Sequence, residues 1–485
     1  MSKTNPARGM RDFLPADVRK REYVIGIIKE VYESYGFEPL ETPAVENLET
    51  LMGKYGEEGN QLIFKILKRG EKLVQSAGFS PSERDESRTL NELSDLALRY
   101  DLTVPLARVV AHHRNDLPKF FKRYQIQPVW RADRPARGRF REFYQCDVDA
   151  IGSTSVVVET ELISAVCTVL TRLGFKRADF KVLLNHRKFL FDSLVLSGIE
   201  EKYHLDALVA MDKLEKIGPD SVRMEMLSRG IPENAAESFR EFIHELATAQ
   251  LASADLAPSA VNIKALNIAR NRFEQTGTSQ DSLDTVERLL DLSQSGSAKE
   301  MVLFAPALAR GLSYYTGSIM EIYSYLPKGA EDVEEFKGSL GGGGRYDGLI
   351  GMFGKEQIPA CGFSLGLERI LVVMEERGMF PPEIAESAPA DVMVTIWSEE
   401  TVAESLKLAS ELRSAGLRVT VYPEPDKLGK QMKYADQINV PYVCVLGETE
   451  IAEGKVTLKN MKTGNQDTLD REAASTIADH INKGV

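Results

Sequence analysis

The feature that most constrains the fold is the stretch 123–152, which reads RYQIQPVWRADRPARGRFREFYQCDVDAIG. Residues 124–130 are typical of a strand, and residues 143–150 mix apolar and polar side chains in a second extended run. Between the two runs, Pro135 and Gly138 indicate a loop over residues 132–138. The stretch therefore predicts a long antiparallel hairpin that carries polar residues inside a buried sheet.

The charge of this hairpin is opposite to that of the chain as a whole. Residues 119–141 hold eight basic residues and one acid, Asp133, whereas the chain has a net charge of −12. Guanidinium groups match phosphate oxygens in bidentate pairs. Four arginines of the hairpin therefore suit a polyphosphate ligand: Arg131, Arg137, Arg139 and Arg141.

Two polar residues of the second strand can serve one pocket. Gln145 and Asp149 lie four residues apart, so their side chains share a face of the strand. Asp133, beside the arginines, can hold a base amine or orient an arginine. An ordinary solvated hairpin with surface ion pairs explains the same residues equally well by chemistry alone.

The hairpin resembles motif 2 of the class II aminoacyl-tRNA synthetases, in which an R-x-[DE] sequence precedes a loop and a returning strand. Arg131 and Asp133 occupy these positions, and RGRFREFYQCDVD at 137–149 is similar to the histidyl-tRNA synthetase family, closer to its eukaryote-like branch than to the common bacterial one. The resemblance implies an antiparallel catalytic sheet of six strands with helices, an α+β fold.

Composition sets the general class of protein. A chain of 485 residues exceeds one typical domain, and 43% hydrophobic with 27% charged residues is typical of a globular protein. The sequence has no apolar run of membrane-spanning length and no secretory signal, so we expect a cytoplasmic protein without a membrane partner. Its four cysteines form no CxxC pair, which argues against a zinc site or a disulfide framework.

The first part of the chain predicts a helix followed by an extended segment. Residues 17–35 have the apolar spacing of an amphipathic helix, and residues 37–46, FEPLETPAVE, carry Pro39 and Pro43. This order resembles motif 1, the dimer-interface element of class II enzymes, and implies a homodimer. An edge strand that contains proline is the alternative.

The segment 98–108, LRYDLTVPLAR, holds a second candidate site. The resemblance implies that Asp101, Leu102 and Thr103 contact the amino group of bound histidine. Asp101 or Thr103 can equally cap a helix that begins near Val104, and both roles can hold together. The neighbouring pair at 112–113, two histidines, fits surface or packing positions better than catalysis.

The segment 187–299 has helical periodicity throughout, which predicts a helical insertion between two parts of one sheet. In the family that it resembles, such an insertion is thought to reach the acceptor arm of tRNA. Residues 308–317, LARGLSYYTG, then match a signature of the same family, with Ser313 where aspartate is frequent. Aromatic rings can enclose an imidazole, and an arginine can meet a carboxylate or α-phosphate; the residues concerned are Arg310, Tyr314 and Tyr315.

Two further segments complete the predicted catalytic region. Residues 341–348, GGGGRYDG, lack the sequence of a P-loop and predict a flexible turn at a sheet edge. Residues 360–373 read as a strand followed by a helix, and GLER at 366–369 resembles motif 3, whose arginine holds the tail of ATP. Arg369 would then face the phosphates from the first turns of the helix.

Residues 379–389 are rich in proline and predict a linker. Strands and helices then alternate from residue 390 to residue 485, with strands at 392–397, 417–422, 442–446 and 455–459, which predicts a mostly parallel sheet. This region resembles the anticodon-binding domain of the histidyl, prolyl, threonyl and glycyl enzymes. Because the region is acidic, we expect local contacts with splayed bases.

Together these observations predict two parts of a catalytic domain at 1–184 and 300–378, an insertion at 185–299, a linker at 379–389 and an anticodon-binding domain at 390–485. The implied activity joins L-histidine to tRNA(His) with ATP and Mg²⁺. Catalytic roles fall to Arg131, Arg310 and Gln145. ATP contacts fall to Arg131, Asp133, Arg139 and Arg369, and histidine contacts to Asp101, Leu102, Thr103, Arg131, Gln145, Asp149, Arg310, Tyr314 and Tyr315.

Two alternatives stay open at this point. One is a non-catalytic histidine-binding paralogue, such as the regulatory subunit of ATP phosphoribosyltransferase, which the C-terminal region and the complete LARGLSYYTG segment argue against. The other is a prolyl or threonyl enzyme, which should lack the adjacent tyrosines in this setting.

Overall fold

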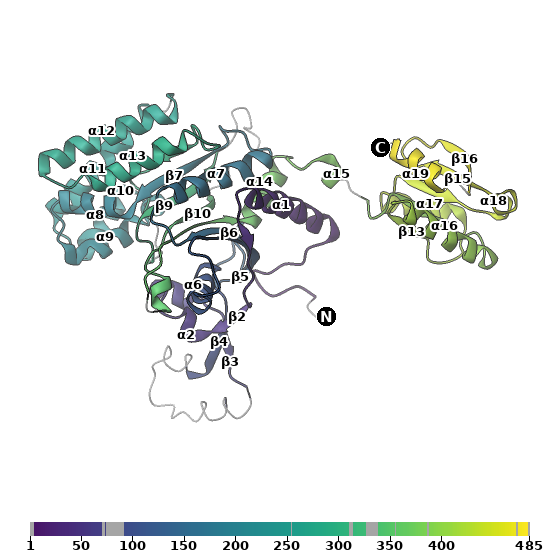
Figure 1. The fold of residues 1–485 in the computed structure, drawn as a ribbon, viewed down its shortest axis with the longest axis horizontal. Coiled ribbons are helices and arrows are strands. Elements are labelled where there is room, and N and C mark those ends of the chain that lie inside the picture. Colours follow the sequence, from purple (N-terminus) through teal and green to yellow (C-terminus); the bar gives the residue numbers. More distant parts are fainter. Residues whose placement is uncertain are drawn as a thin grey trace. The chain divides into compact units, whose positions relative to one another are not determined.

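The computed structural model describes residues 4–69, 73, 92–253, 255–309, 314–325, 338–354, 356–385, 388–471 and 474–483. The chain forms two compact units, Met1–Met379 and Phe380–Val485 (Figure 1). No helix among the described residues is long and apolar enough to cross a membrane.

The first unit is built on an eight-stranded sheet. Its six inner strands run antiparallel, as predicted, and a short parallel strand is added at each edge. In spatial order the strands are β1 (Glu38–Pro39), β5 (Phe121–Trp130), β6 (Glu142–Ile151), β11 (Ala360–Gly366), β10 (Ser339–Arg345), β9 (Ser318–Ser324), β7 (Phe180–His186) and β8 (Val302–Phe304).

The predicted hairpin is confirmed as β5 and β6. The two strands pair without interruption from Phe121 opposite Ile151 to Trp130 opposite Glu142. Because side chains alternate between the faces of a strand, one face of the hairpin collects polar residues. We call this side of the sheet the polar face, defined by Arg123, Gln125, Gln127, Gln145, Asp147 and Asp149.

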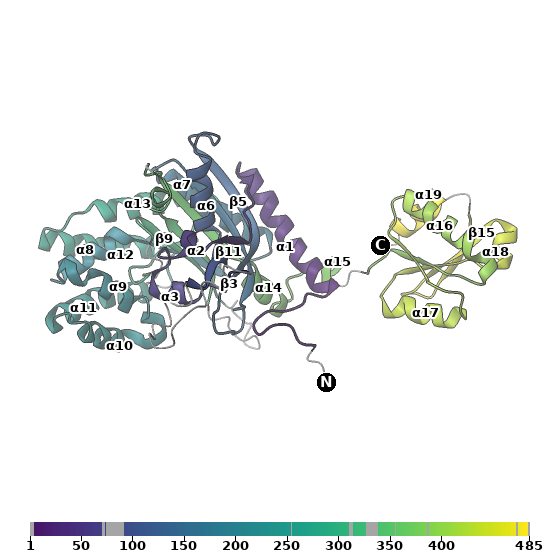
Figure 2. The same ribbon diagram turned by 90° about the horizontal axis from the view of Figure 1, so that it is seen from below.

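The opposite face of the sheet is covered by helices α1 (Pro15–Ser34), α7 (Val157–Arg172) and α14 (Leu367–Glu376), which pack on one another and on the strands. α1 begins with Pro15 in its first turn, where the missing N–H costs nothing, and buries Tyr32. The ring of Tyr32 lies 6.1 Å from that of Tyr124, the residue opposite Val148. Figure 2 shows α1 alongside β5. The helices therefore leave the polar face to other elements.

The glycine run at 341–348 corrects one prediction. Residues 339–345 are not a turn at the sheet edge but the fully buried strand β10, between β11 and β9. A Cβ atom on Gly343 would lie 2.0 Å from the backbone oxygen of Gly362, and one on Gly341 would lie 2.5 Å from that of Ser364. Glycine is required here by the close approach of neighbouring strands, and not by a turn.

A small sheet and several helices complete the core beside the polar face. The sheet has the order β2 (Val45–Asn47), β4 (Ser94–Leu98) and β3 (Lys65–Leu67). The helices are α2 (Leu48–Leu51), α3 (Gly56–Gln61), α6 (Thr103–His112) and the 3₁₀ turn η2 (Ile350–Met352). Residues 78–89, whose serine, glutamate and arginine content predicts a loop, lie outside the described residues.

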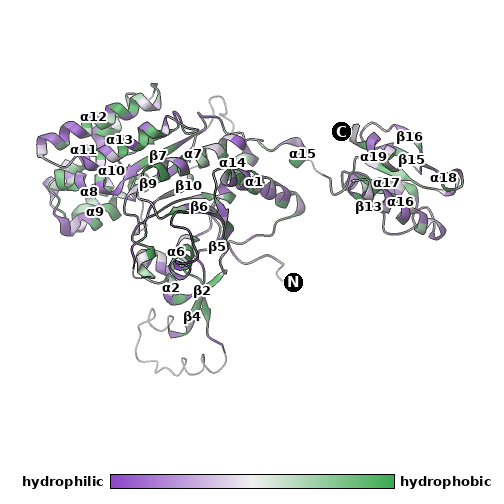
Figure 3. Ribbon diagram, viewed as in Figure 1, coloured by the Kyte–Doolittle hydropathy of each residue, from purple (hydrophilic) through white to green (hydrophobic). Residues whose placement is uncertain are grey.

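The predicted helical insertion is confirmed as helical between β7 and β8. Green and purple alternate along its helices in Figure 3, as expected for amphipathic helices that pack together. They are α8 (Arg187–Leu196), η1 (Glu201–Tyr203), α9 (His204–Met211), α10 (Leu214–Ser228), α11 (Glu233–Leu251), α12 (Pro258–Thr276) and α13 (Asp281–Ser293).

The second unit has a five-stranded sheet in the order β13 (Val419–Val421), β12 (Val392–Val394), β14 (Tyr442–Val445), β15 (Lys455–Asn460) and β16 (Gln466–Asp470). Only the first two pairings are parallel, so the prediction of a mostly parallel sheet is wrong. A chain reversal near Gly464 forms a hairpin where the sequence predicted one strand. Its other elements are α15 (Pro382–Ala385), η3 (Glu399–Thr401), α16 (Val402–Ser414), α17 (Leu428–Gln437), α18 (Glu448–Glu453) and α19 (Ala474–Lys483).

Candidate active site

The centre of the polar face is a buried group of Arg123, Asp149 and Tyr346. Arg123 Nη2 lies 2.8 Å from Asp149 Oδ2 and donates to the Leu102 backbone oxygen at 3.3 Å. The Tyr346 hydroxyl donates to Asp149 Oδ1. Burial raises the pKa of Asp149, and the Arg123 charge opposes that rise. The sequence suggested Asp149 as a histidine contact but did not indicate its two partners, because Arg123 lies on β5 and Tyr346 directly follows β10.

The strand next to Asp149 leaves space for its side chain. Gly362 of β11 lies opposite Asp149, and a Cβ atom at this position would stand 1.8 Å from Asp149 Oδ1. Ser364 lies opposite Asp147, and Gly366 lies opposite Gln145. The small residues on β11 thus leave room for the side chains of Gln145, Asp147 and Asp149 on the polar face of β6.

Gln145 is held at one end of this face. Its Nε2 donates to the Ser364 hydroxyl at 3.0 Å, while its Oε1 is buried and receives no hydrogen bond from any described residue. The position agrees with the shared face predicted for Gln145 and Asp149. A buried carbonyl oxygen can accept a hydrogen bond from a donor on a ligand.

Asp147 lies between Gln145 and Asp149 and was not among the predicted site residues. Its side chain is 1% exposed, and none of the residues described donates to its Oδ1. Burial raises its pKa, while the Arg123 charge and the Ser364 hydroxyl lower it. The alternation of the strand, which predicted the face of Gln145, could have identified Asp147 as well.

The segment at 101–103 has one of the two roles that the sequence suggested, the helix cap, and its acid is buried. Asp101 Oδ1 accepts from the backbone N–H of Val104 at 3.0 Å, in the first turn of α6, and from the Tyr55 hydroxyl at 3.0 Å. The carboxylate is buried, and this burial raises its pKa, while the Val104 hydrogen bond and the Arg131 charge lower it. Asp101 is therefore both a helix cap and a buried acid of the site. Tyr55 is a further residue that the sequence did not indicate.

Aromatic rings enclose this part of the site. Tyr314 and Tyr315 are buried, with ring centroids 5.1 Å apart, and Tyr314 lies 6.1 Å from Tyr346. A hydrogen bond with Thr103 opposes the effect of burial on the Tyr314 pKa, so the two side chains meet. The structure thus brings the predicted residues 101–103 and 314–315 together.

The arginines of the hairpin have different environments. Arg131 Nε donates to the Tyr100 backbone oxygen at 2.9 Å, and its guanidinium stands 4.3 Å from the Tyr100 ring centroid. Arg141 Nε donates to the Asp133 backbone oxygen at 3.1 Å, and Arg137 Nε donates to Glu376 at 2.9 Å. Arg139 is exposed on the loop. Of the four, Arg131 lies nearest to the buried site, because its charge acts on Asp101.

The motif 3 helix is joined to the hairpin through Glu368. Both carboxylate oxygens of Glu368 accept from the Tyr144 backbone N–H, at 3.0 and 3.1 Å. Burial raises the pKa of Glu368 to about 7, although the Tyr144 hydrogen bond and the Arg11 charge lower it. The next residue, Arg369, lies in the first turn of α14 as predicted, and its Nη1 donates to the Ser339 backbone oxygen at 2.5 Å.

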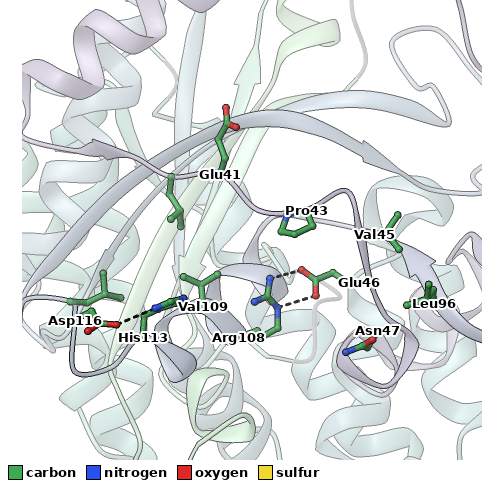
Figure 4. Close-up of a pocket in the computed structure, with 12 residues that line it drawn as sticks. Glu41, Pro43, Val45, Glu46, Asn47, Leu96, Arg108, Val109, His113 and Asp116 are labelled. Atoms are coloured by element: carbon green, nitrogen blue, oxygen red, sulfur yellow. Dashed lines mark hydrogen bonds and ion pairs between the residues drawn. The ribbon is translucent and has the colours of Figure 1, made fainter.

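Several residues of interest lie elsewhere. Arg310 and Ser313 fall outside the described residues. His112 and His113 are exposed, and His113 Nδ1 lies 3.2 Å from Asp116, as expected for surface positions. His113 and Asp116 line a separate cavity of about 550 Å³ beside Pro43, where Arg108 pairs with Glu46 at 2.7 Å (Figure 4).

An antiparallel sheet that presents a basic hairpin, with a strand and helix bearing Arg369 beside it, defines a class II aminoacyl-tRNA synthetase core. The family model described as histidyl-tRNA synthetase matches residues 9–82 and 89–370, and that described as anticodon binding domain matches residues 391–479. The chain belongs to the histidyl-tRNA synthetase family.

Individual relatives agree with this assignment over the whole chain. A histidine–tRNA ligase from Porphyromonas gingivalis is 42% identical, with 99% of both chains covered, and one from Christiangramia forsetii is 41% identical, with 96% of both covered. The crystal structure of histidyl-tRNA synthetase from Nostoc sp. PCC 7120 is similar with a TM-score of 0.75, 29% identity and 99% of both chains covered.

A second solved structure, titled as an ATP phosphoribosyltransferase regulatory subunit/histidyl-tRNA synthetase from Bacillus halodurans, has a TM-score of 0.68 at 21% identity. It covers 92% of this chain and 99% of its own. At this identity the likeness concerns the fold alone. The full-length ligase relatives therefore favour the synthetase over the regulatory paralogue.

Proposed function

We propose that this protein activates L-histidine with ATP and transfers it to tRNA(His). The observation that carries the proposal is the group of buried acceptors on the polar face, next to the enclosed tyrosines. Gln145 Oε1 and Asp147 Oδ1 receive no donor from the described residues, and the charge of Asp101 acts on Asp147. Such a site suits a small ligand with an ammonium group and ring N–H donors.

In the first step, a histidine carboxylate oxygen attacks the α-phosphorus of ATP. The new bond joins that oxygen to phosphorus, the bond from the α-phosphorus to the bridging oxygen breaks, and pyrophosphate leaves. Such chemistry depends on positioning and charge neutralisation. We assign Arg131 and Arg310 to the α-phosphate and the carboxylate, and Asp133, Arg139 and Arg369 to the rest of ATP. Asp101, Leu102, Thr103, Gln145, Asp149, Tyr314 and Tyr315 hold histidine.

In the second step, the terminal hydroxyl oxygen of the tRNA attacks the carbonyl carbon of histidyl-adenylate. An ester bond forms, AMP leaves, and the hydroxyl proton is lost to the phosphate or to solvent. The donors that hold the adenylate in the first step also hold it here. No additional catalytic side chain is required for this proposal.

Magnesium is expected with the β- and γ-phosphates. Among the described residues, no three His, Cys, Asp or Glu side chains gather as ligands for a metal ion. Mg²⁺ bound to ATP takes most of its ligands from phosphate and water and needs one or two carboxylates. The ion supplies positive charge to the leaving pyrophosphate.

The remaining parts of the chain suggest how tRNA is held. We assign residues 390–485 to the anticodon and the insertion at 185–299 to the acceptor arm, with catalytic parts at 1–184 and 300–378 and a linker at 379–389. In the second unit, Trp397 is 49% exposed and lines a cavity of about 690 Å³ with Lys459 and Gln466. An exposed indole next to polar groups suits a splayed nucleobase.

A homodimer is also part of the proposal. The segment 37–46 resembles the dimer-interface element of class II enzymes, and Pro43 and Val45 of this segment line the cavity of Figure 4. Val45 is 40% exposed in the single chain. Sedimentation velocity of the purified protein tests this part, since a monomer at micromolar concentration contradicts it.

The activity is tested by ATP–pyrophosphate exchange with each amino acid in turn. Exchange that depends on histidine supports the synthetase. Histidine binding without exchange contradicts the synthetase and supports a non-catalytic histidine-binding paralogue instead.

A further inference from the structure

We propose that Asp147 joins residues 101–103, which the family resemblance assigns to the amino group, in binding the α-ammonium group of histidine, and that its charge contributes to the requirement for an amino acid. The proposal rests on the proposed function and extends it to a residue outside the assigned set. Asp147 is the middle member of the row Gln145, Asp147 and Asp149, all on the polar face. Side chains two residues apart point to the same face of a strand, so a ligand that contacts both Gln145 and Asp149 also lies over Asp147.

The first observation is the environment of the Asp147 oxygens. The side chain is 1% exposed, yet no described residue donates to Oδ1. The directly opposite residue on β5, Gln125, uses its Nε2 to donate to Thr42 and Gln127, at 2.9 and 2.6 Å. Buried acceptors in folded proteins nearly always have donors, so an acceptor at a binding site that lacks one is suited to a ligand.

The second observation is the balance of charge. Arg123 Nη2 lies 2.8 Å from Asp149 Oδ2 but 3.9 Å from Asp147 Oδ2. The Tyr346 hydroxyl also serves Asp149 and not Asp147. Arg123 therefore neutralises mainly Asp149. Burying an ionised carboxylate without a close positive charge raises the free energy of the folded protein, and a bound cation lowers it again.

The third observation concerns the other charges that face Asp147. Asp101, before α6, and Asp149, on β6, raise the pKa of Asp147, and Arg123, on β5, lowers it. Arg131, at the end of the hairpin, acts on Asp101. Among the residues that the structure describes, three buried carboxylates thus share two guanidinium groups. At neutral pH the only full positive charge on histidine is its ammonium group, because the imidazole is mostly neutral.

The test is Asp147→Asn, which keeps the shape of the side chain and removes its charge. The wild-type protein first establishes histidine-dependent pyrophosphate exchange; without that exchange the proposed function fails, and the role of Asp147, which rests on it, fails with it. With it, D147N is expected to raise the KM for histidine at least about tenfold, since hydrogen bonds to charged groups are strong. The KM for ATP should stay within about twofold, because ATP is held by other residues.

A matched control separates this role from a structural one. Asp179 is also buried, and it accepts from the Lys176 backbone N–H at 2.8 Å, away from the polar face. Asp179→Asn should lower thermal stability without raising the KM for histidine relative to the KM for ATP. If D147N changes both KM values equally, or neither, Asp147 is a structural partner of Arg123 and the proposal is wrong.

Two inhibitors identify the group that Asp147 recognises. Histidinol has the ammonium and imidazole groups without the carboxylate, whereas 3-(imidazol-4-yl)propionate has the imidazole and carboxylate without the ammonium. D147N should weaken histidinol as much as histidine and leave imidazolepropionate unchanged. Equal weakening of both contradicts recognition of the ammonium. If D147N does not fold, Asp147→Ser takes its place, and failure of both to fold shows that the carboxylate is structural and overturns the proposal.

Discussion

Arg123 and Asp149 lie directly opposite each other in the ladder between β5 and β6, and their side chains meet at 2.8 Å in a fully buried position. Arg123 begins the stretch that predicted the hairpin, and Asp149 lies near its end. The ion pair therefore joins the two strands at the base of the hairpin, and it also reaches residue 102 through the Leu102 backbone oxygen.

Replacing Arg123 by methionine should destabilise the protein strongly. The variant leaves Asp149 buried without its partner, and such a loss costs about 3–5 kcal/mol. Urea denaturation of the first unit measures the change. Arg172→Ala is the matched control, because Arg172 and its partner Glu30 are 45% and 64% exposed. Its cost should stay below about 1 kcal/mol, and a similar cost for both variants would refute the importance of burial.

Gly362→Ala should weaken histidine binding. The added methyl group would stand 1.8 Å from Asp149 Oδ1, so the carboxylate must move away from Arg123 and Tyr346. We expect a higher KM for histidine and a stability loss of about 1–3 kcal/mol. Gly26→Ala in α1 is the control, because nothing lies within 4 Å of its added Cβ atom. An unchanged KM for histidine in G362A would remove Asp149 from the binding site.

Arg310→Ala should abolish adenylate formation while the protein stays folded and assembled. The arginine is assigned to the α-phosphate and carboxylate, and removing such a donor costs about a hundredfold or more in rate. Pyrophosphate exchange measures the rate, and gel filtration checks the assembly. Normal turnover in R310A would exclude Arg310 from the mechanism.

The stability of the protein should depend on pH through Glu368. The folded pKa of about 7 lies above the ordinary value of 4.5, so the folded state holds a proton that the unfolded state has lost between these values. This contribution is full below pH 4.5 and is lost as pH rises through 7. Glu368→Gln keeps an acceptor for the Tyr144 N–H and should reduce the slope of stability against pH by up to about 1.4 kcal/mol per unit. Denaturation at several pH values measures it, and identical slopes would contradict the raised pKa.

Trp397→Ala should impair tRNA charging without affecting activation. Loss of a stacking platform costs about 1–3 kcal/mol per base, which should appear as a higher KM for tRNA(His). Pyrophosphate exchange without tRNA should be unchanged. Leu406→Ala, which removes another exposed apolar side chain of the second unit, is the control. A normal KM for tRNA in W397A would place base recognition elsewhere.

The sequence predicted those features that depend on neighbours along the chain. The hairpin of β5 and β6 follows from alternation and from its loop residues, and the helical insertion follows from periodicity. The helix-capping role of Asp101 was predicted correctly, because a helix cap is a local signal. The face shared by Gln145 and Asp149 also followed from strand geometry alone.

The sequence failed where contacts join distant segments. Gly341 and Gly343 appeared as a turn, because the chain itself does not reveal that the neighbouring strand approaches within 2.5 Å of their Cβ positions. Tyr55 and Tyr346 were missed because each meets its carboxylate across the fold. In the second unit, β15 runs antiparallel to both β14 and β16, against the prediction of a mostly parallel sheet. The alternation of residues in a strand does not indicate whether its neighbours run parallel or antiparallel to it.

The most direct measurement of the central claim is amino-acid-dependent ATP–pyrophosphate exchange by the wild-type protein, with all twenty amino acids tested separately. We expect exchange with histidine alone, because buried polar groups reject ligands that leave them unpaired by about 10⁴-fold or more. Exchange with another amino acid, or histidine binding without exchange, would contradict it.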